Sequence, residues 1–216
     1  MILRTLGALF EAWRKFRVLC MRHYWASRFA ETGARLSIGD QFQAYGVDHI
    51  HVGDDVVLAN RVTLRAMTAY PWADPPQSFE PKLVLKSGCF VNNGCQISCI
   101  DRVTIGENVM LAEYCFIADN NHSHEDPDRA IKHQPLRSAG ELVIGDGSWI
   151  GANCCVIGAV RIGRHCVVGA NSVVNTDLPD FSLAVGAPAR VVRRYDPASR
   201  TWAKVNPSPP NCPDEA

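Results

Sequence analysis

The sequence predicts a mainly β protein, a parallel β-helix that follows one N-terminal α-helix and precedes a short C-terminal extension. Aliphatic residues recur every six positions without a slip from Ile144 to Val174. Four of them are followed directly by Gly, which suits tight corners. Neither the helical nor the strand period generates a repeat of six, and a six-residue repeat is the signature of β-helix coils.

Composition narrows the function classes. The chain has 216 residues, 47% of them hydrophobic, with 22 basic and 22 acidic side chains. The apolar share argues against a disordered chain, and the balanced charge argues against a general nucleic-acid binder. No stretch approaches the roughly 20 apolar residues needed to span a bilayer. We find no secretory signal and expect a cytoplasmic protein.

Residues 1–30 form the first predicted unit, a basic amphipathic helix. Apolar residues recur at three-to-four spacing, and six basic side chains stand against Glu11 alone. One interpretation is a helix that packs its apolar stripe on the body of the protein. The other is a peripheral contact with the anionic inner face of a membrane.

Residues 31–192 form the predicted β-helix. Three hexads, or 18 residues, close one triangular coil, so each inward aliphatic residue stacks on its equivalent one coil later. The expected stacked pairs are Ile144 with Ile162, Ile150 with Val168, and Val156 with Val174.

Small residues occupy the fourth position after each inward aliphatic residue. Five of the nine cysteines fall there, which fits free cysteine acting as a small buried hydrophobe rather than as a disulfide partner. The predicted small inward residues are Val56, Val62, Cys89, Cys95, Val109, Cys115, Ser148, Cys154, Val160, Cys166 and Ser172.

Two segments interrupt the repeat. Residues 69–81 are proline-rich and aperiodic, and residues 119–140 are polar and hold three of the seven histidines. Loops that leave a rigid scaffold tend to carry function. After the last hexad, residues 193–216 form an extension whose end we expect to be disordered.

His122 is the strongest candidate for chemistry. It lies at the root of the second excursion, where the coils hold it and leave it accessible, a setting that suits a general base near neutral pH. The alternative is an exposed loop histidine with no role. His124 and His133 are expected to be surface residues.

The repeats resemble the hexapeptide-repeat acetyltransferases. The resemblance rests on the segments 143–153, 168–174 and 185–192 and is strongest to the sugar O-acetyltransferases of the galactoside, maltose, nodulation and polysaccharide-biosynthesis type. It implies a left-handed parallel β-helix, a homotrimer with active sites between subunits, and acetyl-CoA as donor. It also implies a sugar or polysaccharide precursor as the acceptor, and no metal.

The same resemblance implies roles for individual residues. His122 matches the catalytic histidine. Position 176 is Thr where the family often has Lys, and position 94 is Gly where galactoside enzymes place a substrate-binding Asn, which puts a galactoside acceptor in doubt. The implied cofactor-binding residues are Trp149, Ala152, Ala170, Asn175, Thr176, Arg190 and Arg193, and the expected substrate-binding residues are Asn92, Asn93 and Asp119.

Two rival functions stay open. A γ-carbonic-anhydrase-like metalloenzyme would also use a left-handed β-helix, but it needs paired histidines five residues apart, and His122 and His124 are two apart. A non-catalytic β-helix scaffold or binding protein is the other rival. It is disfavoured because His122, Trp149, Arg190 and Arg193 occur together.

Overall fold

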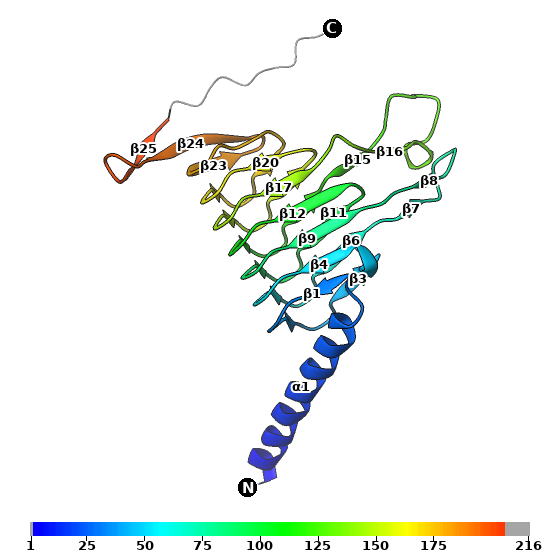
Figure 1. Ribbon diagram of the computed structural model, residues 1–216, viewed down its shortest axis with the longest axis vertical. Coiled ribbons are helices and arrows are strands. Elements are labelled where there is room, and N and C mark those ends of the chain that lie inside the picture. The colour runs from blue at the N-terminus through cyan, green and yellow to red at the C-terminus, as the bar shows by residue number, and fades with distance from the viewer. Residues whose placement is uncertain (1, 206–216) are drawn as a thin grey trace.

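The six-residue repeats fold into coils of three short strands, and the coils stack into a prism with three parallel sheets (Figure 1). The computed structural model describes residues 2–205. We name the three sheets faces A, B and C, in the order in which the chain visits them. The predicted mainly β architecture with parallel strands is therefore confirmed.

Each face contains one strand from every coil. Face A holds β1 (Glu31–Thr32), β4 (Ile50–Val52), β9 (Lys82–Leu85), β12 (Arg102–Ile105), β17 (Leu142–Ile144) and β20 (Arg161–Ile162). Face B begins with β2 (Ser37–Ile38), β5 (Val57–Leu58), β10 (Phe90–Val91), β13 (Met110–Leu111), β18 (Trp149–Ile150) and β21 (Val167–Val168). Face C holds β3 (Gln43–Tyr45), β6 (Thr63–Ala66), β11 (Gln96–Cys99), β14 (Phe116–Ala118), β19 (Cys155–Ile157) and β22 (Val173–Val174).

Aliphatic side chains fill the inside of the prism in vertical columns. Ile144 pairs in register with Ile162 on face A, and equivalent pairs form on the other two faces, as the repeat predicted. All eleven small residues expected to point inward are buried, including the five cysteines. Close packing of the coils also explains why glycine occupies corners such as Gly145, where a side chain would collide with the next coil. A Cβ at Gly145 would lie 2.6 Å from the backbone nitrogen of Arg164.

Helix α1 (Ile2–Ala26) precedes the coils and projects away from them (Figure 1). Trp25 near its C-terminal end packs against Phe29 and Phe42, and Arg17, farther along the helix, pairs with Asp40. Within a single chain the helix therefore does not lie along the coil stack (Figure 1). Within residues 2–205, no helix combines the length and apolar character needed to cross a bilayer.

Both interruptions of the repeat contain structure that the sequence did not predict. The first forms an antiparallel hairpin of β7 (Ala69–Tyr70) and β8 (Gln77–Ser78). The second pairs β15 (Asn120–His122) with β16 (Leu136–Ser138). Two short 3₁₀-helices complete the elements, η1 (Val47–His49) and η2 (Ile131–His133).

The chain leaves the last coil through face B. There β23 (Ser182–Gly186) is followed by the antiparallel strands β24 (Ala189–Asp196) and β25 (Thr201–Lys204), which form a terminal hairpin. The expected disordered end, residues 206–216, lies outside the described residues.

Candidate active site

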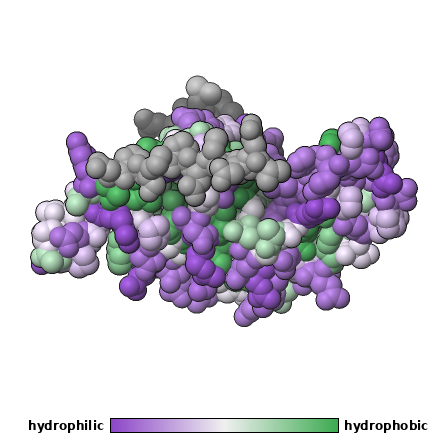
Figure 2. All heavy atoms as spheres, turned by 90° about the horizontal axis from the view of Figure 1, so that it is seen from above, coloured by the Kyte–Doolittle hydropathy of each residue, from purple (hydrophilic) through white to green (hydrophobic). Residues whose placement is uncertain are grey.

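The two excursions pack together into one lobe, which we call the insertion lobe (residues 69–81 and 119–140). Its residues Tyr70, Ala73 and Leu136 form a separate apolar cluster with Ile100 of the adjoining coil. Seen from above, the part of the molecule that projects to the right is largely hydrophilic (Figure 2). The insertion lobe is thus a polar structure with a small core of its own, set beside the main column of the coils.

Hydrogen bonds join the two excursions at several points. The side chain of Gln77 makes two bonds to the backbone of Leu136, one of 2.7 Å and one of 3.1 Å. The hydroxyl of Tyr70 donates to the carbonyl oxygen of Lys132 at 2.7 Å. His133 donates through Nδ1 to the carbonyl oxygen of Trp72 at 2.9 Å. These bonds fix the shape of the insertion lobe around the segment that carries His122.

His122 ends strand β15 and is exposed, so the expected combination of a fixed backbone and an accessible imidazole is present. Its backbone pairs with Leu136 across the hairpin. Its ring packs against the ring of Tyr70, with centroids 5.5 Å apart. The strand, the hairpin partner and the neighbouring ring together restrict where the imidazole can point.

Asp119 differs from its expected place. It is fully buried, and its carboxylate accepts hydrogen bonds from the backbone N–H groups of Ile100 and Asp101 and from the side-chain amide of Asn120. A buried carboxylate with three donors is occupied inside the chain. We therefore revise its role from substrate contact to fixing the root of the insertion lobe.

The other predicted site residues form two groups at opposite edges of face C. Asn92, Asn93, Ala152 and Ala170 lie at the corner where face B turns into face C. Asn92 donates to Glu113 at 2.8 Å, and the carbonyl oxygen of Ala152 accepts from the N–H of Asn171. Trp149 lies on face B beside this corner and is 45% exposed.

The second group lies at the corner where face C turns into face A, which is also the corner that carries His122. Asn175 and Thr176 follow β22 and are exposed. Thr176 and Arg190 line one hollow of about 180 Å³. Arg193 lies apart from this corner, because it is exposed on β24 and pairs with Leu183 of β23 on face B. Within one chain, a strand of face C that is up to four residues, or roughly 13 Å, long lies between the two groups.

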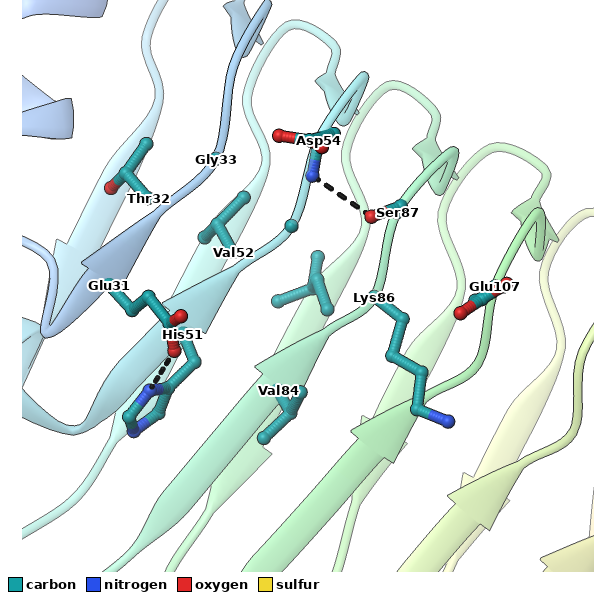
Figure 3. A pocket seen from close by; sticks show the side chains of 12 residues that line it. Glu31, Thr32, Gly33, His51, Val52, Asp54, Val84, Lys86, Ser87 and Glu107 are labelled. Atoms are coloured by element: carbon teal, nitrogen blue, oxygen red, sulfur yellow. Dashed lines mark hydrogen bonds and ion pairs between the residues drawn. The ribbon is translucent and has the colours of Figure 1, made fainter.

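A second hollow, a groove of about 360 Å³, opens on face A (Figure 3). Its lining includes Lys86 and His51, whose ring nitrogen Nδ1 lies 3.3 Å from a carboxylate oxygen of Glu31. None of the predicted site residues lines this groove. Among the residues that the structure describes, no three His, Cys, Asp or Glu side chains are grouped so as to hold a metal ion.

Sequence reasoning missed two features near the predicted site. Tyr70 lies in an aperiodic segment, and no pattern in the sequence points to its contact with His122. The second feature is an outward apolar row on face B. The sequence could have indicated it, because apolar residues directly precede the inward aliphatic ones there. This row joins Val57, Phe90, Met110, Trp149, Val167 and Leu183 in register.

Comparison with known proteins supports the resemblance seen in the repeats. The family model of the bacterial transferase hexapeptide (six repeats) matches residues 142–176. The chain is 36% identical over 121 residues to an Escherichia coli K12 protein named "Putative lipopolysaccharide biosynthesis O-acetyl transferase WbbJ". It is 31% identical over 132 residues to the galactoside O-acetyltransferase of the same organism.

The chain carries the hexapeptide repeat over residues 142–176 and is similar in sequence to these two named O-acetyltransferases. The first match covers 53% of this chain and 62% of WbbJ, and the second covers 58% of this chain and 61% of the galactoside enzyme. The chain thus spans about three fifths of the length of these two members of the family.

The fold also occurs among solved structures. AntD, an N-acyltransferase from Bacillus cereus crystallised with dTDP and 3-hydroxybutyryl-CoA, superposes with a TM-score of 0.67. The superposition covers 83% of this chain and 90% of AntD at 16% sequence identity. At that identity the likeness shows a shared fold.

Proposed function

We propose that the protein is an O-acetyltransferase that moves an acetyl group from acetyl-CoA to a hydroxyl of a sugar or polysaccharide precursor. The observation that carries this proposal is the exposed imidazole of His122, held by a hairpin and by Tyr70 beside a hexapeptide-repeat body. The two relatives are named as O-acetyltransferases, and AntD was crystallised with an acyl-CoA, which supports the same donor class here.

The proposed coils wind left-handed, and the proposed assembly is a homotrimer with its active sites between subunits. Two observations support a shared site. The outward row on face B leaves Phe90, Met110 and Trp149 exposed by 38%, 45% and 45%, a contiguous apolar strip that a second copy could cover. In addition, the two groups of predicted site residues lie at opposite edges of face C.

In this assembly His122 of one subunit faces the Asn92 corner of the next. Asn92 and Asn93 then hold the acceptor, and the insertion lobe supplies the rest of its binding surface. Trp149, Ala152 and Ala170 line the path of the pantetheine arm. Asn175, Thr176, Arg190 and Arg193 lie toward the donor's phosphates, where a guanidinium group can pair with two phosphate oxygens.

The proposed chemistry is general base catalysis. The imidazole of His122 accepts the proton of the acceptor hydroxyl as its oxygen attacks the thioester carbonyl. The bond between carbonyl carbon and sulfur then breaks, and the coenzyme A thiolate takes the proton back from the imidazolium. The products are an acetyl ester and free coenzyme A. A positioned base contributes about 10²–10⁴-fold to such a reaction, and positioning supplies much of the rest.

We also propose the three-part organisation given above, with a helical unit over residues 1–30, the transferase body over 31–192 and an extension over 193–216. A cytoplasmic location, at the inner face of a membrane, would give the enzyme access to acetyl-CoA and to lipid-linked sugar acceptors.

The proposal is tested by incubating the purified protein with acetyl-CoA and a panel of free, nucleotide-linked and lipid-linked sugars. Release of the coenzyme A thiol should require an acceptor, and the acceptor should gain the mass of one acetyl group. Reactions without acceptor, and reactions with a heat-denatured sample, are the controls. Failure to bind coenzyme A, together with no thiol release on any acceptor, would contradict the proposal.

A further inference from the structure

Helix α1 leaves most of its length uncovered. It projects from the coil stack (Figure 1), and it contacts the body through Arg17, which pairs with Asp40, and through Trp25, which packs against Phe42. The apolar side chains Phe16 and Leu19 are 65% and 59% exposed, and Trp13 and Tyr24 are 56% and 49% exposed. Such a contiguous set of large exposed hydrophobic residues marks an interaction surface.

These four residues cover a broad part of the helix. At 100° per residue, Leu19, Phe16, Trp13 and Tyr24 span roughly 140° of the circumference. The narrow seam of a coiled coil uses only two of every seven positions and is much narrower than this arc. A broad aromatic and aliphatic face suits a helix that lies flat in the interface of a bilayer.

The charge of the helix distinguishes between two possible partners, other copies of the helix and an anionic lipid surface. Residues 1–30 contain six basic side chains and only Glu11 as an acidic one. Lys15 and Arg22 lie within about 20° of each other on the helix, about 160–180° from Trp13 and about 40–60° from Leu19, so they flank one edge of the apolar face. Three copies of this helix packed together would bring like charges close with few acidic partners, whereas anionic lipid headgroups attract basic side chains.

We propose that helix α1 docks the protein on the surface of an anionic phospholipid bilayer, with Phe16 and Leu19 in the acyl boundary and Lys15 and Arg22 toward the headgroups. The anchored Trp25 end then connects the bilayer-bound helix to the coils. This inference stands apart from the proposed acetyl transfer, because it uses none of the residues placed in that site.

The test is flotation of the full-length protein with vesicles on a density gradient. One vesicle preparation contains phosphatidylglycerol and phosphatidylcholine in equal parts, and the other contains phosphatidylcholine alone. We expect the protein to float with the anionic vesicles and not with the neutral ones. Because bulk salt screens the attraction between exposed charges, added salt should reduce the floating fraction.

Phe16→Glu is the variant that removes apolar contact, and Tyr45→Glu is its matched control. Tyr45 is an aromatic residue on β3 with 52% exposure, so both variants replace an exposed aromatic side chain by a carboxylate. Phe16→Glu should weaken anionic vesicle binding on the order of tenfold or more, because burying one such ring is worth more than a factor of ten. Tyr45→Glu should leave binding unchanged.

Three results would overturn the proposal: no flotation of the unmodified protein, equal flotation with both vesicle types, or equal flotation of the two variants. Light scattering without vesicles tests the alternative, in which other copies of this chain cover the helix. A loss of oligomer mass in Phe16→Glu alone would show that copies of this chain cover the helix. Acetyl transfer to a soluble acceptor, measured without vesicles, tests the proposed function separately.

Discussion

The ring of Tyr70 packs edge-on against the imidazole of His122, with ring planes 69° apart. The two residues lie 52 positions apart in the sequence and belong to different excursions from the coils. Tyr70 is itself fixed by burial and by the bond from its hydroxyl to Lys132. Because Tyr70 is held in place, its contact restricts the orientation of the His122 imidazole, the proposed base.

Tyr70→Ala should lower kcat for acetyl transfer by roughly 10- to 100-fold, because a base displaced by a fraction of an ångström loses alignment with its substrate. Tyr70→Phe keeps the ring contact and should retain most of the activity. Steady-state kinetics with a fixed acceptor provide the measurement, and the KM for acetyl-CoA should change little. Full activity in Tyr70→Ala would show that His122 needs no support from this ring.

The inward columns should dominate stability. Leu64 is fully buried on β6, and its neighbour Thr63 points outward. Leu64→Ala should reduce the free energy of unfolding by about 2–5 kcal/mol, through lost apolar burial and the cavity left behind. Thr63→Ala should change it by less than about 1 kcal/mol. Denaturant unfolding of both variants makes the comparison, and similar losses in the two would contradict the assigned inward and outward faces.

The outward row on face B should mediate self-association. Met110→Glu places a carboxylate at the centre of this row, between Phe90 and Trp149. Light scattering should show three chains for the unmodified protein and a lower mass for Met110→Glu. Thr63→Glu, on face C, is the control and should keep the mass of the unmodified protein. An unchanged mass in Met110→Glu would place the subunit contact elsewhere.

Alkaline pH should destabilise the fold through its buried thiols. Burial raises the pKa of Cys89 from an ordinary value near 9.0 to about 12. Between these values the unfolded chain loses the thiol proton and the folded chain keeps it, so the free energy of unfolding falls as pH rises. Below pH 9 both states are protonated and this contribution is constant. Denaturant midpoints at several pH values give the measurement, and Cys89→Ser should show a weaker dependence on pH.

The sequence predicted the coils well because each hexad obeys a local rule. Each hexad supplies an inward aliphatic residue and a small residue, often with a glycine at the corner. Because three hexads complete one coil, Ile144 stacks on Ile162. The insertion lobe obeys no such rule. Its shape comes from contacts such as Gln77 with Leu136, which join segments 59 positions apart. The burial of Asp119 has the same origin, since its partners Ile100 and Asp101 lie in the preceding coil.

The central claim is that the imidazole of His122 performs acetyl transfer, and its neighbour His124 offers a matched control on the same loop. Both side chains are exposed and lie two residues apart. The decisive measurement is turnover of acetyl-CoA by His122→Ala and His124→Ala, with the coenzyme A affinity of each determined by calorimetry. We expect His122→Ala to lose about 10²–10⁴-fold in turnover at unchanged affinity, and His124→Ala to stay near the unmodified protein. Equal turnover in the two variants would contradict the account.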